Sequence, residues 1–132
     1  DDTFAQMEQK ANSEGLAAAK ELYTKMAQEI EHHFQMEERV IFPAFEEKTG
    51  MTEGPTQMMR MEHVQMRSLI QEIGEAIDND DKDRFFGLTE TMMIMVQQHN
   101  MKEEQMLYTM AQQHLGAESD RIVDMMQSMI VE

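Results

Sequence analysis

The stretch HFQMEERVIF, residues 33–42, recurs as HNMKEEQMLY at residues 99–108. Both copies place a pair of glutamates four and five residues after a histidine, and both end on an aliphatic and then an aromatic residue. A spacing of four residues brings two side chains to the same face of a helix, one turn apart. The sequence therefore predicts two helices that each present an imidazole and a carboxylate in one direction. This donor set suits a pair of iron or manganese ions inside a helix bundle.

Composition narrows the classes of function. A chain of 132 residues is expected to form one domain, spanning residues 1–132, with a core that needs no disulfides. The absence of cysteine excludes thiol catalysis, iron–sulfur clusters and thiolate zinc sites. A net charge of −15 argues against nucleic acid and anionic membrane surfaces as partners. No apolar run approaches the ~20 residues of a membrane span, and no signal peptide is visible. We therefore expect a cytoplasmic protein, either a monomer or a homodimer.

Helical periodicity extends over nearly the whole sequence, which contains only two prolines and six glycines. The first expected helix covers about residues 1–11, and the second carries apolar positions from Leu22 to Ala44 and is ended by Pro43 and residues 48–50. A third helix lies between the turn at 54–56 and residues 78–81, and a fourth runs from about residue 82 to Leu115–Gly116. A short tail helix is expected from Ser119. The predicted fold is all-α, an up-down-up-down four-helix bundle with a short C-terminal fifth helix.

Five polar side chains fall within the apolar stripes of these helices. They are His33 and Glu37 on the second helix, His63 on the third, and His99 and Glu103 on the fourth. On the second helix the stripe also contains Leu22, Met26, Ile30, Val40 and Ala44. A buried carboxylate is costly unless a cation compensates it. A metal pair neutralises both carboxylates and uses every imidazole, so we favour a metal site over an internal hydrogen-bonded network of histidine and glutamate.

These residues resemble the hemerythrin-like family, also called the HHE cation-binding domain. The resemblance rests on three segments in the family's order, HHFQMEE at residues 32–38, MRMEHVQMR at 59–67 and QQHNMKEE at 97–104, and spans nearly the whole chain. It implies a four-helix bundle that holds a non-haem di-iron centre of the Fe–O–Fe type, with manganese or zinc as substitutes.

The resemblance also implies roles for the five polar residues. His33, His63 and His99 would be terminal ligands, and Glu37 and Glu103 would be bridging carboxylates. The implied function is binding of dioxygen or another small diatomic ligand, for carriage, storage or sensing, by a ligand-binding protein rather than an enzyme. The alternatives are redox handling of nitric oxide or peroxide, with an unidentified redox partner, iron donation for repair of iron–sulfur centres, and a bundle with a vestigial site.

The chain departs from the family pattern in two places. Oxygen-carrying hemerythrins have a second histidine four residues after the one on the third helix, whereas Arg67 occupies that position here. We expect Arg67 to lie outside the set of ligands, paired with a carboxylate or facing solvent. The first helix also lacks the family's histidine, and alignment of Phe4 with Ile70 places its counterpart four positions upstream of Asp1. We expect that the full protein carries this ligand before the first residue of the chain. The alternative is a genuine loss of the histidine, which would leave one metal under-coordinated.

Several residues have more ordinary interpretations. His32 points about 100° away from His33 around the helix and is expected at the surface, as is His114. Glu38 and Glu104 are the alternatives to Glu37 and Glu103 as bridging carboxylates. The 17 methionines suggest copper, but most lie on core stripes, where they fill gaps. A ferritin-like bundle is disfavoured because the repeated order here is His-x3-Glu and His63 stands where that fold would have a glutamate. The His-Glu-x2-His motif of zinc hydrolases is missing.

Overall fold

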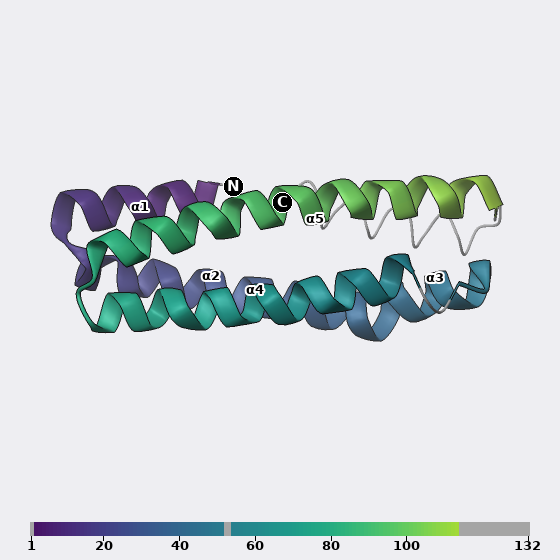
Figure 1. Cartoon of the computed structure of the whole chain (residues 1–132), viewed down its shortest axis with the longest axis horizontal. Coiled ribbons are helices and arrows are strands. Elements are labelled where there is room, and N and C mark those ends of the chain that lie inside the picture. The colour runs from purple at the N-terminus through teal and green to yellow at the C-terminus, as the bar shows by residue number, and fades with distance from the viewer. Residues whose placement is uncertain (1, 52–53, 114–132) are drawn as a thin grey trace. The chain divides into compact units, whose positions relative to one another are not determined.

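The structure, a computed structural model, describes residues 2–51 and 54–113, and every regular element in this part of the chain is helical. The elements are, in chain order, α1 (Asp2–Glu14), the short 3-10 helix η1 (Leu16–Ala19), α2 (Lys20–Met36), the π-helical segment η2 (Glu37–Ile41), α3 (Phe42–Thr49), α4 (Pro55–Asp78) and α5 (Lys82–Gln113). Figure 1 labels α1 to α5 along the chain. The all-α class is thus confirmed. The predicted tail helix from Ser119 lies outside the described residues, as does His114.

The helices end where the sequence provides residues that favour a break. Gly15, with a φ of 96°, follows α1, and Gly50 ends α3 in the left-handed conformation with a φ of 73°. Pro55 stands at the first position of α4, where its missing N–H costs nothing. Asp81 caps α5 because its side chain accepts a hydrogen bond from the backbone N–H of Arg84 at 3.2 Å.

The prediction that Pro43 helps to end the second helix is wrong, because the helix continues to Thr49. A proline ring collides with the carbonyl four residues earlier in a regular α-helix. Here the wider turn of η2 immediately precedes Pro43, and the Phe42 N–H bonds to the carbonyl of Glu37, five residues back. The end of the helix at Thr49 and Gly50 was predicted correctly.

The π-helical segment also rotates the buried face of the helix. Val40, which the regular spacing placed on the apolar stripe, is 42% exposed. Ile41, Phe42 and Phe45 are buried instead, and Ala44 is only partly buried. The extra residue in the turn therefore keeps Glu37 in the core and moves the apolar face after it by about one position.

The chain divides into two compact units. The first unit comprises residues 1–32 and 64–96. Its buried side chains are Phe4, Met7, Ala11, Leu16, Ala19, Met26, Met66, Ile73, Ala76, Ile77, Phe85, Thr89 and Met92. Within this unit Tyr23 lies over Gly74 and donates a hydrogen bond to the carbonyl of Ile70 at 2.8 Å. Phe4, Met7 and Ala11 form the buried face of α1.

The described residues of the second unit are 33–51, 54–63 and 97–113. Its apolar cluster joins η2, α3, α4 and α5 and consists of Ile41, Phe42, Phe45, Met59 and Met106. Glu46 on α3 accepts hydrogen bonds from Thr56 and Arg60 on α4, both at 2.6 Å, which ties the two helices together. The polar residues of the sequence motifs lie in this unit.

None of the described helices is both long enough and apolar enough to cross a membrane.

Candidate metal centre

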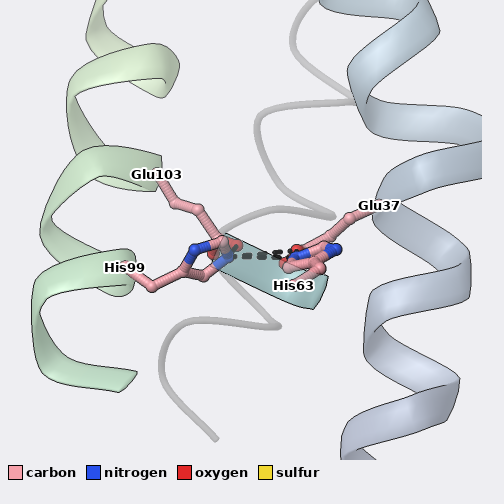
Figure 2. Close-up of side chains that lie close together, drawn as sticks. All are labelled: Glu37, His63, His99 and Glu103. Carbon is pink, nitrogen blue, oxygen red and sulfur yellow. Dashed lines mark hydrogen bonds and ion pairs between the residues drawn. The ribbon is translucent and has the colours of Figure 1, made fainter. Parts of the chain in front are cut away.

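Four of the five predicted ligands come together in the second unit. Glu37 from η2, His63 from α4, and His99 and Glu103 from α5 each offer a ligand atom, and these atoms lie within 4.8 Å of one another. The four side chains converge on one point (Figure 2) and are between 0% and 5% exposed. A site made of two imidazoles and two carboxylates is therefore buried among these three elements.

The nitrogen and oxygen atoms in the centre are crowded. The Nε2 atoms of His63 and His99 are 3.2 Å apart, and Oε1 of Glu37 lies 2.8 Å from the first and 3.4 Å from the second. Oε1 of Glu103 lies 2.8 Å from His99 Nε2, yet no described residue gives this buried atom a hydrogen bond of acceptable geometry. Since an N–H of His99 can point to only one of these neighbours, hydrogen bonding alone leaves the centre incompletely satisfied.

Several residues of the chain that runs from α2 into α3 contact the imidazole of His63. Its Nδ1 donates to Oε2 of Glu38 at 2.7 Å, while its Nε2 faces Glu37. The ring of Phe34 stacks on the imidazole at 3.9 Å between centroids and 15° between planes, and Phe42 lies at 5.4 Å. The imidazole therefore has one orientation, with Nε2 directed into the centre.

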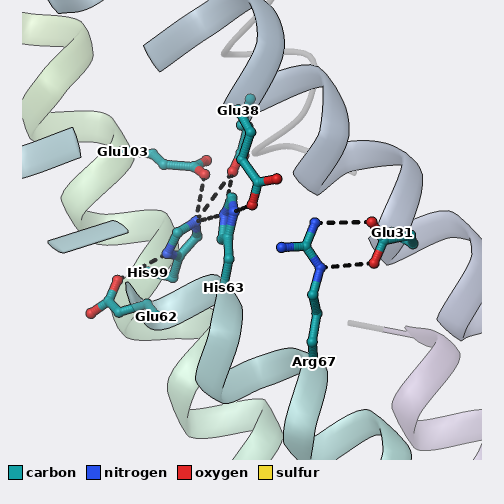
Figure 3. Close-up of polar contacts among 8 residues, drawn as sticks. Glu31, Glu38, Glu62, His63, Arg67, His99 and Glu103 are labelled. Atoms are coloured by element: carbon teal, nitrogen blue, oxygen red, sulfur yellow. Dashed lines mark hydrogen bonds and ion pairs between the residues drawn. The ribbon is translucent and has the colours of Figure 1, made fainter. Parts of the chain in front are cut away.

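His99 is held in a corresponding way by α4. Its Nδ1 donates to Oε1 of Glu62 at 2.9 Å, and the ammonium of Lys102 pairs with the other oxygen of the same carboxylate. Figure 3 shows Glu38 and Glu62 as the outer partners of the two imidazoles. Both histidines thus use Nδ1 for a carboxylate outside the centre and direct Nε2 inward.

Burial and charge act on the acid–base behaviour of the centre in opposite directions. Burial raises the pKa of Glu37, but hydrogen bonds from His63, His99 and Glu103 outweigh it and hold the pKa below its ordinary range. Burial and the neighbouring carboxyl group of Glu37 raise the pKa of Glu103, although the close approach of His99 opposes this. Burial lowers the pKa of His99, but its bonds to Glu103 and Glu37 dominate and raise the pKa to about 10. Without a metal, protons must supply the positive charge that the centre requires.

The residues fit a metal ion. When Nδ1 donates to an outer carboxylate, a neutral histidine keeps its lone pair on Nε2, which is the arrangement of metal-bound histidines. The two Nε2 lone pairs and the carboxylate oxygens then face one another, and a cation removes their repulsion. The donor set is nitrogen and oxygen without sulfur, which suits iron, manganese or zinc.

The remaining predicted residues lie elsewhere. His33 is half-buried on α2 and does not belong to the group of four, so its role as a ligand stays a prediction. Glu104 is exposed, which favours Glu103 over Glu104 as the inward carboxylate, and His32 is exposed as expected. Arg67 donates to both oxygens of Glu31, at 2.8 and 2.9 Å, in agreement with the expectation that it pairs with a carboxylate (Figure 3).

Sequence reasoning missed the residues that orient the imidazoles. Glu62 lies directly before His63 but faces His99, and its turn around α4 places it outside the apolar stripe. The sequence pattern indicates Glu38 only as an alternative to Glu37 as the bridging carboxylate, so it does not predict the contact of Glu38 with Nδ1 of His63. Glu62 and Glu38 each stand next to a predicted ligand in the sequence, which could have indicated their role. In so acidic a chain, however, an acidic residue at such a position is common.

The model of the hemerythrin HHE cation-binding domain matches residues 1–111. The chain belongs to this family. No curated protein and no solved structure shows significant similarity to it. Membership and the buried cluster of two histidines and two glutamates together indicate a metal-binding site.

Proposed function

We propose that this chain binds a carboxylate-bridged pair of iron ions and that the centre reversibly binds dioxygen. Glu37, His63, His99 and Glu103 would hold the metals, with His33 as a further terminal ligand. The observation that supports this proposal best is the use of both Nδ1 atoms by Glu38 and Glu62, because it leaves two Nε2 atoms and two carboxylates directed at one buried point. Iron held by imidazole and carboxylate supplies a change of oxidation state and an open position for a small ligand.

Glu37 is the carboxylate best placed to bridge. Its Oε1 lies within 3.4 Å of the Nε2 atoms of both His63 and His99, which come from different helices. Glu103 is close to His99 on its own helix, one turn away. The aromatic rings of Phe34 and Phe42 exclude water from the His63 side, and a dry surround favours reversible binding of an uncharged ligand.

The arrangement of helices proposed with this function is the up-down-up-down four-helix bundle expected from the sequence. Family membership and the order of four long helical stretches support it. A single domain and a cytoplasmic location also stay predictions.

Metal content and ligand binding test the proposal in two steps. The chain is loaded with Fe(II) without oxygen, its iron is counted by mass spectrometry, and its absorption is followed as dioxygen is admitted and then removed. Near two irons per chain and a spectrum that returns to its starting form are expected. His63→Ala should lower the iron content, with one iron lost more readily than the other, whereas the exposed control His32→Ala should leave it unchanged.

Two results would contradict the proposal. A chain without stoichiometric iron has no such centre. A chain that binds iron but consumes the added dioxygen does not bind it reversibly. That result would favour the alternative function, redox handling of nitric oxide or peroxide.

A further inference from the structure

We propose that Glu38 and Glu62 are positioning residues that set the tautomer and direction of the two histidine ligands and thereby the affinity of the centre for metal. This inference rests on the proposed metal centre but not on iron or dioxygen. Neither carboxylate is part of the group of four ligands, and each contacts a different histidine on the Nδ1 side.

Glu37 and Glu38 act on opposite nitrogens of one imidazole. Glu37 approaches Nε2 of His63 at 2.8 Å, and Glu38 approaches Nδ1 at 2.7 Å. Two consecutive residues of a regular helix diverge by about 100°, but these two stand at the start of the π-helical segment and bracket the same ring. His63 is fully buried, so the bond to Glu38 is shielded from water at the ring.

Glu62 holds His99 from the neighbouring helix and is itself held. Its side chain is 16% exposed, one oxygen accepts from His99 Nδ1, and the other pairs with Lys102. Lys102 is the chain neighbour of the ligand Glu103, just as Glu62 is the neighbour of His63. The outer contacts therefore link the three helical elements that supply ligands.

A carboxylate on Nδ1–H has two effects on a metal-bound imidazole. It fixes the tautomer that carries the lone pair on Nε2, and it raises the basicity of that nitrogen. Loss of such a partner typically weakens metal binding by roughly tenfold to a hundredfold. We expect this loss for each residue, acting through its own histidine.

The test uses Zn²⁺, which is diamagnetic, with the chain labelled with ¹⁵N at histidine. Glu38→Ala and Glu62→Ala are compared with Glu38→Gln and Glu62→Gln, whose amide oxygen can still accept the bond. Glu104→Ala is the matched control, since it removes an exposed carboxylate next to a ligand without touching either imidazole. Zinc affinity is measured by competition with a chelator, and the ¹⁵N spectrum reports which ring nitrogen of each histidine carries the proton.

We expect the alanine variants to bind zinc roughly tenfold to a hundredfold more weakly, the glutamine variants to recover part of the loss, and the control to bind as the parent does. Glu38→Ala should alter the signals of His63 alone, and Glu62→Ala those of His99 alone. Unchanged affinity and tautomers in a chain that binds zinc would overturn the positioning role and leave the centre standing. Changes in both histidines from each single variant would also overturn it. A parent chain that binds no metal would overturn the centre and the inference together.

Discussion

The two units of this protein bury different kinds of side chain. Among the buried polar residues of the described part, only Thr89 belongs to the first unit, and its hydroxyl bonds to the carbonyl of Phe86. The second unit buries two glutamates and two histidines beside its aromatic and methionine side chains. The core of the first unit needs only good packing, whereas that of the second contains charges that must be compensated. The stability of the second unit should therefore depend on what the centre binds.

Removal of metal should have the largest effect. A ligand present at a thousand times its Kd stabilises the folded state by about 4 kcal/mol, so chelation should lower Tm on the order of 10 °C. Hydrogen exchange followed by mass spectrometry should show lost protection in residues 33–63 and 97–113 before residues 2–32 and 64–96. Equal loss of protection in both units, or an unchanged Tm, would contradict the expected dependence of the second unit on metal.

Replacement of a buried carboxylate by an apolar side chain should stabilise the metal-free protein, whereas removal of the metal destabilises the parent. Glu103→Leu removes a buried carboxyl group whose Oε1 has no hydrogen-bond partner among the described residues and whose pKa burial and Glu37 raise. Since a buried polar group without a hydrogen-bond partner costs about 1–3 kcal/mol, we expect the metal-free variant to be more stable by about that amount while it loses metal binding and the response to chelator. Urea unfolding of both proteins in excess chelator measures this difference. A less stable metal-free variant would show that Glu103 contributes to folding without a metal.

The difference between the units was only partly visible in the sequence. The His-x3-Glu repeats and the position of His63 on an apolar stripe predicted the four residues that converge, because a regular helix fixes which side chains share a face. The π-helical segment was not predicted, since the spacing of apolar residues assumes a regular helix. As a result Val40 was placed on the buried stripe, and the pairing of Glu38 with His63 was missed. Contacts between helices, such as Glu62 with His99, depend on packing that no local pattern contains.

In the first unit, Gly74→Ala tests how strongly stability depends on close packing where no charged group is involved. A Cβ at this position would lie 2.5 Å from the hydroxyl oxygen and 2.8 Å from Cζ of Tyr23. The ring must move and its bond to Ile70 must break, so we expect a loss of about 1–3 kcal/mol. Gly87→Ala is the matched control, since nothing lies within 4 Å of its Cβ, and it should gain about 0.5–1 kcal/mol. Thermal unfolding gives both values, and metal content should stay unchanged. Loss of metal from Gly74→Ala would show that packing in the first unit affects metal binding in the second, contrary to this expectation.

The smallest effect should come from a carboxylate of the second unit that a basic side chain already compensates. The hydrogen bond from Arg60 lowers the pKa of Glu46 below its ordinary value of 4.5, burial opposes this, and the bond from Thr56 adds to it. A lowered pKa stabilises the folded state above pH 4.5, and this contribution disappears as the pH falls through the pKa of the folded protein. Glu46→Gln should therefore cost about 0.2–1 kcal/mol at neutral pH, and its difference from the parent should shrink in acid. Urea unfolding of both metal-free proteins across this range measures that difference. A cost that persists in acid would mean that Glu46 acts through its shape and not through its charge. Glu46 would then resemble the packing residues of the first unit rather than the buried glutamates and histidines of the second unit.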